Sequence, residues 1–580
     1  MKMLKTITPQ QIQSLTKQET LHLCEELRTT IYDTVMQCGG HLSSNLGAIE
    51  STVALFRVFD FPKDKIVFDV GHQCYAYKLL SGRADRFSTL RKAGGISGFP
   101  KREESVYDSY DTGHAGTSIS AAIGLAKARD LQKQDHTVIA YIGDGSFNNG
   151  LVYEALCSLK IMQTNILIIL NDNDMSISPT VGGMHDILFD LKNKQKSDNV
   201  QLLQQFGLQY LGVRDGNDVE EMQTALLQAK HLLKNGSVLL HIATRKGKGY
   251  EFSEEDPTGT HGVSPTGGAK DTEYSEALGE ILCELAKNND KIAVVSAAMK
   301  EALGLAKFFE AYPERAFDVG ICEENAAVLC ASMAAGGLKP YYAIYSTFLQ
   351  RAFDEIIHDV CAQDMPVTFC IDRAGISGPD GETHQGVFDL SYLSLIPNLT
   401  IAVPKNIAEF KQMLKMSATY MHPLAIRYPR AGRAQLGEMD TALQVGKWEY
   451  LHKVNAENDA PVTVIAAGER CLTMAMQVLQ SLQKQGKAFD LVNARFVKPL
   501  DMDLLTNLQS KHVITIEDNA YLGGLGLMIG GEILRLKKQC SVKNFAYKDI
   551  FIPHGKVGEL QEQYGVNMLE IQEYIDKCLL

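Results

Sequence analysis

Residues 136–178 read HTVIAYIGDGSFNNGLVYEALCSLKIMQTNILIILNDNDMSIS, and the rest of the chain is best understood from this stretch. Two apolar runs, Val138–Ile142 and Ile166–Leu170, flank a segment with helical character, which is typical of a βαβ unit with a parallel sheet. Parallel strands end at the same edge of a sheet, and open α/β sheets bind ligands at that edge. We therefore expect Asp144 and Asn173, which follow the two runs, to lie close together.

The residue types at these two strand ends suit a diphosphate held through a divalent metal. Asp144 offers a carboxylate and Asn173 an amide oxygen, and Mg²⁺ takes a few such ligands and completes its shell with phosphate oxygens and water. A lone Gly-Asp-Gly is usually only a tight turn, but GDG followed by NDN at a second strand end is more specific. The pair resembles the thiamine diphosphate and Mg²⁺ motif of thiamine-dependent enzymes. This resemblance implies Asp144, Asn173 and the backbone carbonyl of Met175 as metal ligands.

Length and composition exclude several classes of protein. A chain of 580 residues should form several domains, and 45% hydrophobic with 22% charged residues is ordinary for a soluble globular protein. The net charge of −12 argues against a nucleic-acid partner, although a local basic pocket could still bind a small phosphate. The N-terminus lacks a signal-peptide core and no apolar run reaches about 18 residues, so we expect no membrane partner. Twelve cysteines without a C-x-x-C pair favour the reducing cytoplasm.

Three histidines follow glycines at expected loop edges in the first part of the chain. His41 follows two glycines, His72 follows an expected strand at Ile66–Val70, and His114 precedes an expected helix at Ile119–Ala128. One such histidine is most often incidental, but three together indicate a site. None has a partner at metal-ligand spacing, which favours hydrogen bonding over metal ligation. The small residues before the helix also predict an anion site made of free N–H groups.

Alternating strands and helices predict three α/β domains, at residues 1–270, 271–440 and 441–580. The Gly- and Pro-rich stretch Glu255–Asp271 is the best candidate linker. The third block shows no catalytic constellation and is expected to support an oligomer interface or to complete the fold. Further strands are expected at Val238–Ala243, Ile292–Val295, Ala316–Ile321, Tyr341–Tyr345, Val367–Ile371, Ile401–Val403, Leu424–Tyr428, Val462–Ala467, Phe489–Val492 and Val513–Glu517.

Nine motifs, in the same order along the chain, together resemble one known protein family over nearly the whole sequence. They are HLSSNLG, DVGHQCY, GHAGTS, GDG…NDNDMSIS, STFLQRAFD, DRAGISGPDGETHQG, RYPR, FVKPLD and FIPHG. Together they resemble the 1-deoxy-D-xylulose-5-phosphate synthase family. Single motifs are shared with transketolase and with thiamine-using dehydrogenase components, whereas the DRAG…THQG element combined with HQCY is more specific to the synthases.

The resemblance implies an activity and an architecture. The family uses thiamine diphosphate and Mg²⁺ to condense pyruvate with D-glyceraldehyde 3-phosphate, releasing CO₂. The product feeds isoprenoid, thiamine and pyridoxal precursors. The implied fold has two doubly wound parallel sheets, a diphosphate domain and a pyrimidine domain, with the cofactor between them. A smaller transketolase C-terminal-like domain follows, and a homodimer is expected because the family dimerises.

The resemblance also implies roles for individual residues. Glu323 would hydrogen-bond the aminopyrimidine ring and Phe348 would stack on it, although pattern alone makes Phe348 equally a core residue. The cofactor-binding set is His72, Gly113, His114, Ala115, Gly145, Ser146, Asn173, Tyr250, Glu323 and Phe348. The catalytic set is Glu323, His41, His261, Asp380 and His384, of which the last four would relay protons.

Four further positions match the family's substrate-binding residues: Tyr345, Arg351, Arg373 and Arg430. Arg373 and Arg430 are natural phosphate clamps, because a guanidinium binds phosphate through two hydrogen bonds. Without the resemblance each arginine would be read as a surface or ion-pair residue.

The chain departs from the family in two places. Residues 322–326 read CEENA where the family commonly has AEQHA, so Glu324 adds a carboxylate that could raise the pKa of Glu323. Neighbours on a helix diverge, so we expect a small effect. The segment between Ser178 and Tyr250 is shorter than usual. Its polar part, Pro179–Asn199, is either a lid or a surface excursion, and gating could differ here.

Two alternatives stay open at this point. A transketolase-like enzyme would move two-carbon units between sugar phosphates and would differ in its donor, a ketose phosphate instead of pyruvate. A non-catalytic homologue that binds thiamine diphosphate would be expected to lose Glu323 or the histidines, and this chain keeps both.

Overall fold

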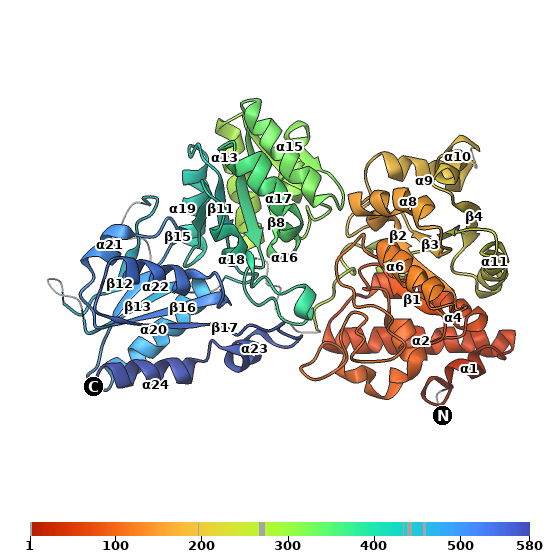
Figure 1. Cartoon of the computed structure of the whole chain (residues 1–580), viewed down its shortest axis with the longest axis horizontal. Helices are drawn as coiled ribbons and strands as arrows, with labels where there is room; N and C mark the ends of the chain where they lie inside the picture. The colour runs from red at the N-terminus through yellow and green to blue at the C-terminus, as the bar shows by residue number, and fades with distance from the viewer. Residues whose placement is uncertain are drawn as a thin grey trace. The chain divides into compact units, whose positions relative to one another are not determined.

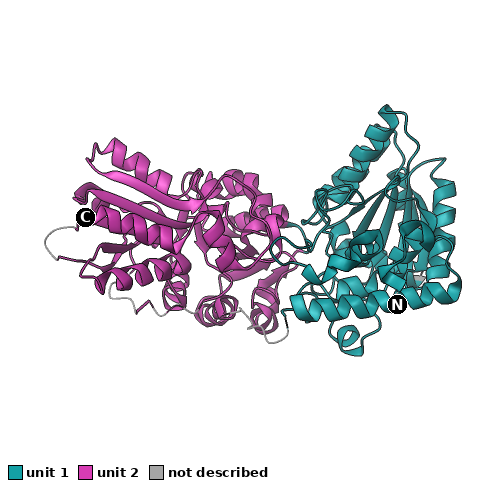
Figure 2. Ribbon diagram, turned by 90° about the horizontal axis from the view of Figure 1, so that it is seen from below, with its two compact units in different colours: residues 1–270, 320–322 teal, residues 271–319, 323–580 magenta. Residues whose placement is uncertain are grey.

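The computed structural model describes residues 3–194, 197–265, 273–432, 434, 436–437, 443–455 and 460–580. It divides into two compact units, coloured separately in Figure 2. The first comprises Met1–Lys270 with Gly320–Cys322, and the second comprises Asp271–Val319 with Glu323–Leu580. Residues 266–271 of the expected linker and the expected boundary at 440/441 lie outside the described residues. The exact domain limits therefore stay a prediction.

The first unit contains a five-stranded, fully parallel sheet in the order β1-β2-β3-β5-β4 (Figure 1). The opening stretch forms β2, then α8, then β3, and Gly143 lies opposite Asn171 in the ladder. The predicted βαβ unit is thus confirmed. The strands are β1 (Lys65–Phe68), β2 (Val138–Gly143), β3 (Leu167–Asp172), β4 (Gln209–Asp215) and β5 (Val238–Ala243).

Helices cover both faces of this sheet, as expected for a doubly wound fold. Ile139 and Tyr141 of β2 pack into one apolar core, and their neighbours Ala140 and Ile142 pack into another. Side chains alternate across a strand, so each face of β2 meets its own helical layer. The helices are α1 (Pro9–Ile12), α2 (Lys17–Cys38), α3 (Ser43–Gly47), α4 (Ile49–Val58), α5 (Tyr75–Lys78), α6 (Ser118–Leu131), α7 (Asp144–Phe147), α8 (Gly150–Met162), α9 (Gly183–Lys194), α10 (Ser197–Gln205), α11 (Val219–Leu232) and α12 (Glu251–Glu255).

The second unit contains two sheets, which bring the total to the three expected α/β sheets. The first has the order β15-β10-β11-β9-β8-β6-β7 and is parallel except for β15, which runs antiparallel to β10. The expected strand at Ala316–Ile321 ends early, at Asp318, and Gly320 beyond it has a φ of 72° that is not extended. The strands are β6 (Ile292–Ser296), β7 (Ala316–Asp318), β8 (Lys339–Tyr345), β9 (Thr368–Asp372), β10 (Thr400–Ala402), β11 (Leu424–Arg427) and β15 (Phe496–Lys498).

The other sheet of this unit has the order β12-β14-β13-β16-β17, with only β12 antiparallel to its neighbour. Its strands are β12 (Glu449–His452), β13 (Val462–Ala467), β14 (Asp490–Asn493), β16 (His512–Ala520) and β17 (Ser541–Tyr547). The helices of the unit are α13 (Glu273–Asn288), α14 (Ala306–Ala311), α15 (Glu323–Ala335), α16 (Ser346–Leu349), α17 (Phe353–Glu355), α18 (Asp389–Ser394), α19 (Ile407–Ser417), α20 (Glu469–Gln483), α21 (Met502–Asn507), α22 (Leu525–Arg535), α23 (Val557–Tyr564) and α24 (Met568–Cys578).

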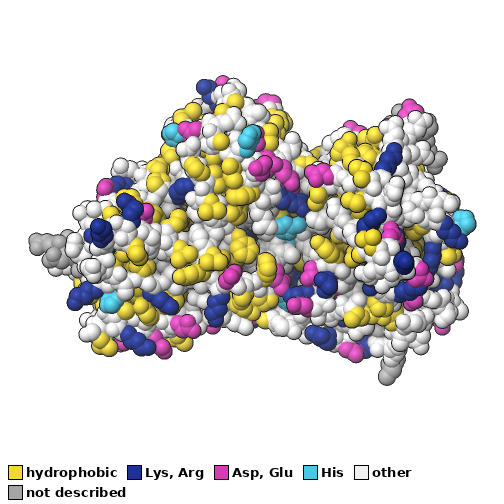
Figure 3. Space-filling model, in the orientation of Figure 1, with side chains coloured by type: hydrophobic (Ala, Val, Ile, Leu, Met, Phe, Trp, Pro, Cys, Tyr) yellow, Lys and Arg dark blue, Asp and Glu magenta, His cyan; other side chains and the backbone are white. Residues whose placement is uncertain are grey.

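The surface carries charges of both signs. On the face drawn in Figure 3, lysine and arginine side chains are scattered among acidic ones. Within the described part of the chain, no helix combines the length and apolar character needed to cross a membrane.

Candidate functional site

The ends of β2 and β3 bring the three expected metal ligands together. Asp144 opens α7 directly after β2 and is only 2% exposed. Its Oδ1 accepts a hydrogen bond from the Asn173 N–H at 3.4 Å, and its Oδ2 accepts one from Thr180 Oγ1 at 2.6 Å. Asn173 Oδ1 in turn accepts from the Met175 N–H at 3.2 Å. The expected proximity of Asp144 and Asn173 is confirmed.

The electrostatics of Asp144 suit a bound cation. Burial, and then the nearby Asp172 carboxylate, raises the pKa of Asp144 to about 7. A divalent cation would reverse this shift, because a metal is the largest local charge in its site. Mg²⁺ accepts a few oxygen ligands from the protein alongside phosphate oxygens. Here they would be one carboxylate, one amide oxygen and one backbone carbonyl. Within the described ranges, no cluster of three or more His, Cys, Asp or Glu side chains could hold a metal alone.

Asp172 is neutralised separately by residues that the sequence did not single out. Its Oδ1 pairs with Lys192 at 2.9 Å and its Oδ2 with His241 at 2.9 Å. Burial opposes ionisation of Asp172, but His241 and Lys192 outweigh it and lower the pKa. Lys192 belongs to α9, so the expected lid or surface excursion forms helices, and its lysine reaches back to the metal edge of the sheet.

The Gly113–Ser118 segment corrects one expectation from the sequence. The buried Asp69 carboxylate, which follows β1, accepts hydrogen bonds from the N–H groups of Gly116 at 2.8 Å and Ser118 at 3.1 Å. The Asp69 carboxylate therefore already binds both N–H groups. The sequence predicted that they would be free to bind an anion, and this prediction is wrong for Gly116 and Ser118. In the same segment Gly113 and Ala115 are buried and His114 is partly buried.

Three of the expected histidines lie together in the first unit. The ring centroids of His41, His72 and His261 are 5.3 to 5.6 Å apart. Ser44 Oγ lies 3.3 Å from Nδ1 of His261. Burial, and then the charges of Lys246 and the other two histidines, lowers the pKa of His261 well below its ordinary value. His261 is therefore neutral at neutral pH and can accept a proton.

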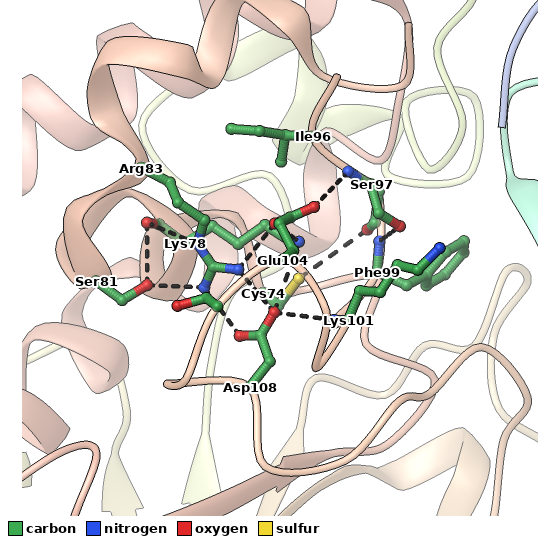
Figure 4. Close-up of polar contacts among 12 residues, drawn as sticks. Cys74, Lys78, Ser81, Arg83, Ile96, Ser97, Phe99, Lys101, Glu104 and Asp108 are labelled. Atoms are coloured by element: carbon green, nitrogen blue, oxygen red, sulfur yellow. Dashed lines mark hydrogen bonds and ion pairs between the residues drawn. The ribbon is translucent and has the colours of Figure 1, made fainter. Parts of the chain in front are cut away.

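A buried ion-pair network is formed by residues of the segment that follows His72 (Figure 4). Arg83 binds both carboxylate oxygens of Asp108, at 2.6 and 2.9 Å, and also reaches Glu104 at 2.8 Å. Lys78 binds Glu104 at 2.5 Å, so two cations balance two anions. Glu104 and Asp108 also accept the backbone N–H groups of Ser97 and Lys101.

The loop held by this network contacts the histidine segments. The Phe99 ring lies 5.6 Å from the His41 ring. A Cβ at Gly71 would come within 2.3 Å of Pro100, which shows how tightly the loop packs beside His72. This ion-pair network was not predicted from the sequence. The charged residues scattered through the otherwise apolar Tyr75–Arg83 segment were the available signal.

Tyr250, an expected cofactor residue, has aromatic neighbours in the first unit. Its ring stacks on Tyr32 with centroids 4.3 Å apart and meets Phe252 edge-on. Gly145 and Ser146, also expected to bind the cofactor, are buried in α7. A Cβ at Gly145 would come within 2.7 Å of Ser176, so the turn needs glycine there.

In the second unit, Glu323 is the first residue of α15 and is 4% exposed. Its Oε2 lies 3.4 Å from Nη1 of Arg351, and Tyr342 donates a hydrogen bond to its carbonyl at 3.1 Å. Burial raises the pKa of Glu323, and Arg351 partly offsets this. Glu324 adds a smaller upward effect than burial does, as the sequence analysis expected.

Four other expected residues form one group in the second unit. The rings of Tyr345 and Phe348 stack with centroids 5.7 Å apart, and His384 meets Phe348 edge-on at 5.6 Å. The Arg373 guanidinium lies over the Tyr345 ring at 3.9 Å. Asp380 and Arg430 are partly buried.

We predict that the ion-pair network is essential for the stability of the first unit. Replacing Arg83 with methionine leaves Asp108 buried without its partner, which should lower the free energy of unfolding by about 3 to 5 kcal/mol. Urea unfolding measures the change. Lys17→Met is the matched control, since it breaks a solvent-exposed pair with Glu220 that water screens and that should contribute far less. Equal losses in the two variants would contradict the prediction.

A second prediction concerns pH. The unfolded chain binds a proton at His261 below a pH of about 6.5, whereas the folded chain resists it, so stability falls as the pH drops from about 7 to about 5. His261→Asn should weaken this loss. Thermal midpoints across that range measure it, with the exposed His231→Asn as control. Parallel curves for wild type and His261→Asn would refute the assignment.

Comparisons with known proteins follow the same division of the chain. Residues 3–202 and 191–244 match the family model described as 1-deoxy-D-xylulose-5-phosphate synthase. Residues 270–433 match the transketolase pyrimidine binding domain, and residues 451–571 match the transketolase C-terminal domain.

Whole proteins named 1-deoxy-D-xylulose-5-phosphate synthase are similar over almost their full length. The protein of Clostridium botulinum (strain Alaska E43 / Type E3) is 42% identical over 615 residues, covering 98% of both chains. That of Clostridium acetobutylicum is 41% identical over 605 residues, covering 96% of both. Among solved structures, transketolase from Campylobacter jejuni is 20% identical with a TM-score of 0.46, covering 97% of this chain and 100% of that one.

Proposed function

Because the chain belongs to the 1-deoxy-D-xylulose-5-phosphate synthase family, it is a thiamine-diphosphate-dependent transferase, and we propose that the residues described above carry its reaction. The reaction joins pyruvate to D-glyceraldehyde 3-phosphate, giving 1-deoxy-D-xylulose 5-phosphate and CO₂. It is the first step of the non-mevalonate isoprenoid route and a source of thiamine and pyridoxal precursors. Similarity over 98% of the chain is the observation that carries this function.

In the first unit, Asp144, Asn173 and the Met175 carbonyl would hold Mg²⁺, and through it the diphosphate. The raised pKa of Asp144 supports this role, because burial and the Asp172 carboxylate disfavour its ionised form until a cation binds. When bound, thiamine diphosphate supplies a nucleophilic carbon and an electron sink. His72, Gly113, His114, Ala115, Gly145, Ser146 and Tyr250 are proposed to bind the same cofactor.

In the second unit, Glu323 would hydrogen-bond the pyrimidine ring and Phe348 would pack against it. Burial favours the protonated carboxyl, and Arg351 limits that preference. A raised pKa brings the Glu323 carboxyl closer to exchanging a proton with a bound ring.

Proton transfer and substrate binding are assigned to the remaining expected residues. His261 and His41, whose ring centroids are 5.5 Å apart, are proposed to relay protons. Asp380 and His384 are proposed for the same task in the second unit. Tyr345, Arg351, Arg373 and Arg430 are proposed to bind the anionic groups of the substrates, since arginine pairs well with carboxylate and phosphate.

Two properties of the protein remain proposals drawn from the sequence alone. A homodimer is expected from the family, and sedimentation of the purified chain measures it. A cytoplasmic location is expected from the cysteine content of the sequence.

The first test is CO₂ release from pyruvate by the purified protein with thiamine diphosphate and Mg²⁺. Release should depend on D-glyceraldehyde 3-phosphate and should accompany a pentulose phosphate product. The transketolase alternative predicts no release from pyruvate, and instead turnover of a ketose phosphate donor. That result would overturn the proposed function.

We further predict that Glu323→Gln abolishes most turnover while leaving cofactor affinity nearly unchanged. Loss of a group that takes part in proton transfer typically costs about 10²- to 10⁴-fold in rate. Steady-state kinetics and calorimetric binding of thiamine diphosphate separate the two effects. Glu324→Gln, one residue along the same helix, is the matched control and should retain turnover. If wild type is active, equal turnover in Glu323→Gln would refute the role of this carboxylate. An inactive wild type would instead revive the non-catalytic alternative.

A further inference from the structure

The 373–386 loop carries three residues of the proposed site: Arg373, Asp380 and His384. It begins directly after β9 and ends shortly before α18. Its neck is closed by two backbone hydrogen bonds, from the Gly375 N–H to the Gly386 carbonyl at 2.7 Å and in the reverse direction at 2.8 Å. Because of this narrow neck, a shift near Gly375 moves the whole loop.

The neck of the loop is held by residues of the third sheet, to which the sequence analysis assigned no chemistry. Asp518, near the end of β16, accepts a hydrogen bond from the Ile376 N–H at 3.1 Å. Arg470 of α20 donates to the Ile376 carbonyl at 2.7 Å and to Asp518 Oδ2 at 3.0 Å. Both backbone polar groups of Ile376 are thus bound by the third sheet and its helix.

Asp518 is itself fixed from several sides. The Tyr547 hydroxyl donates to Oδ1, and the buried Arg427 donates to its backbone carbonyl at 3.1 Å. On the loop side, Gly375 has a φ of 78°, and a Cβ there would come within 2.1 Å of Oδ2. The carboxylate therefore contacts the loop backbone at a point where only glycine fits.

We propose that Asp518 is a positioning residue for the reaction, which sets the placement of the 373–386 loop and thereby of Arg373 over Tyr345 and His384 beside Phe348. This inference rests on the proposed function for the roles of those side chains. Its physical basis is that a carboxylate hydrogen bond to a backbone amide is strong and directional. A displacement of about 1 Å at a reacting group can cost about 100-fold in rate.

The experiment compares Asp518→Ala and Asp518→Asn in the full-length protein. Asp518→Ala should lower kcat/KM for D-glyceraldehyde 3-phosphate by about 10- to 100-fold, because loop residues lose their placement. Thiamine diphosphate affinity should change less than kcat/KM, because the residues proposed to hold its diphosphate lie in the first unit. Asp518→Asn keeps an oxygen that can accept from Ile376 and should recover much of the loss.

Asp490→Ala is the matched control for stability. Asp490 is also buried in the same sheet, and it accepts two backbone N–H groups from outside the loop, of Val454 at 2.8 Å and Ala460 at 3.0 Å. Its kinetics should match wild type at a temperature where it is folded. If Asp518→Ala does not fold, Asp518→Asn and Gly375→Ala, which pushes a methyl group against the carboxylate, give the same comparison.

Two results would overturn the inference. One is kinetics of Asp518→Ala, or of Gly375→Ala where Asp518→Ala does not fold, that equal those of Asp490→Ala. The other is a loss in Asp518→Ala with no recovery in Asp518→Asn. Failure of the proposed function is distinguishable, because wild type itself would then release no CO₂ from pyruvate in the presence of the aldehyde.

Discussion

The parallel ladder between β2 and β3 is the constraint on which the first unit depends. With Gly143 opposite Asn171, the chain must place a carboxylate and an amide side by side at one edge of the sheet. Both strands are apolar and buried on both faces, so a shift in register would bury Asp144 in the core or expose the apolar run. Two residues from later in the chain complete this edge of the sheet. Thr180 binds the Asp144 carboxylate, and Lys192 binds the Asp172 carboxylate.

Several buried charges outside the proposed metal ligands lie in ion pairs. Asp172 contacts Lys192 and His241, and the Arg83 and Lys78 pairs with Asp108 and Glu104 are balanced. Asp144 and Glu323, by contrast, keep raised pKa values despite their neighbours. Carboxylates left with such unfavourable ionisation are expected where a ligand supplies the missing interaction.

The sequence predicted the buried parallel strands best. The limits of β5 and β13 are correct to the residue, because five of the six residues of each are apolar. β4 and β17 were missed because polar and charged residues interrupt them and most of their residues are not fully buried, and such runs look like loops. The proximity of Asp144 and Asn173 followed from strand direction alone. In the network around Arg83, and in the contact between Asp518 and Ile376, the partners are not neighbours in the chain, and the sequence does not show which residues pair.

The short strand β15 has a consequence for how this protein could be divided or recombined. Phe496–Lys498 belongs by sequence to the third block, yet it forms the antiparallel edge of the sheet that carries Phe348 and the 373–386 loop. Cutting the gene after the second block would strip that sheet of its last strand and leave β10 with an open edge, a surface prone to pairing with other chains. The third block is therefore not a detachable module, and the smallest fragment that could evolve or be expressed on its own as this unit must include both sheets.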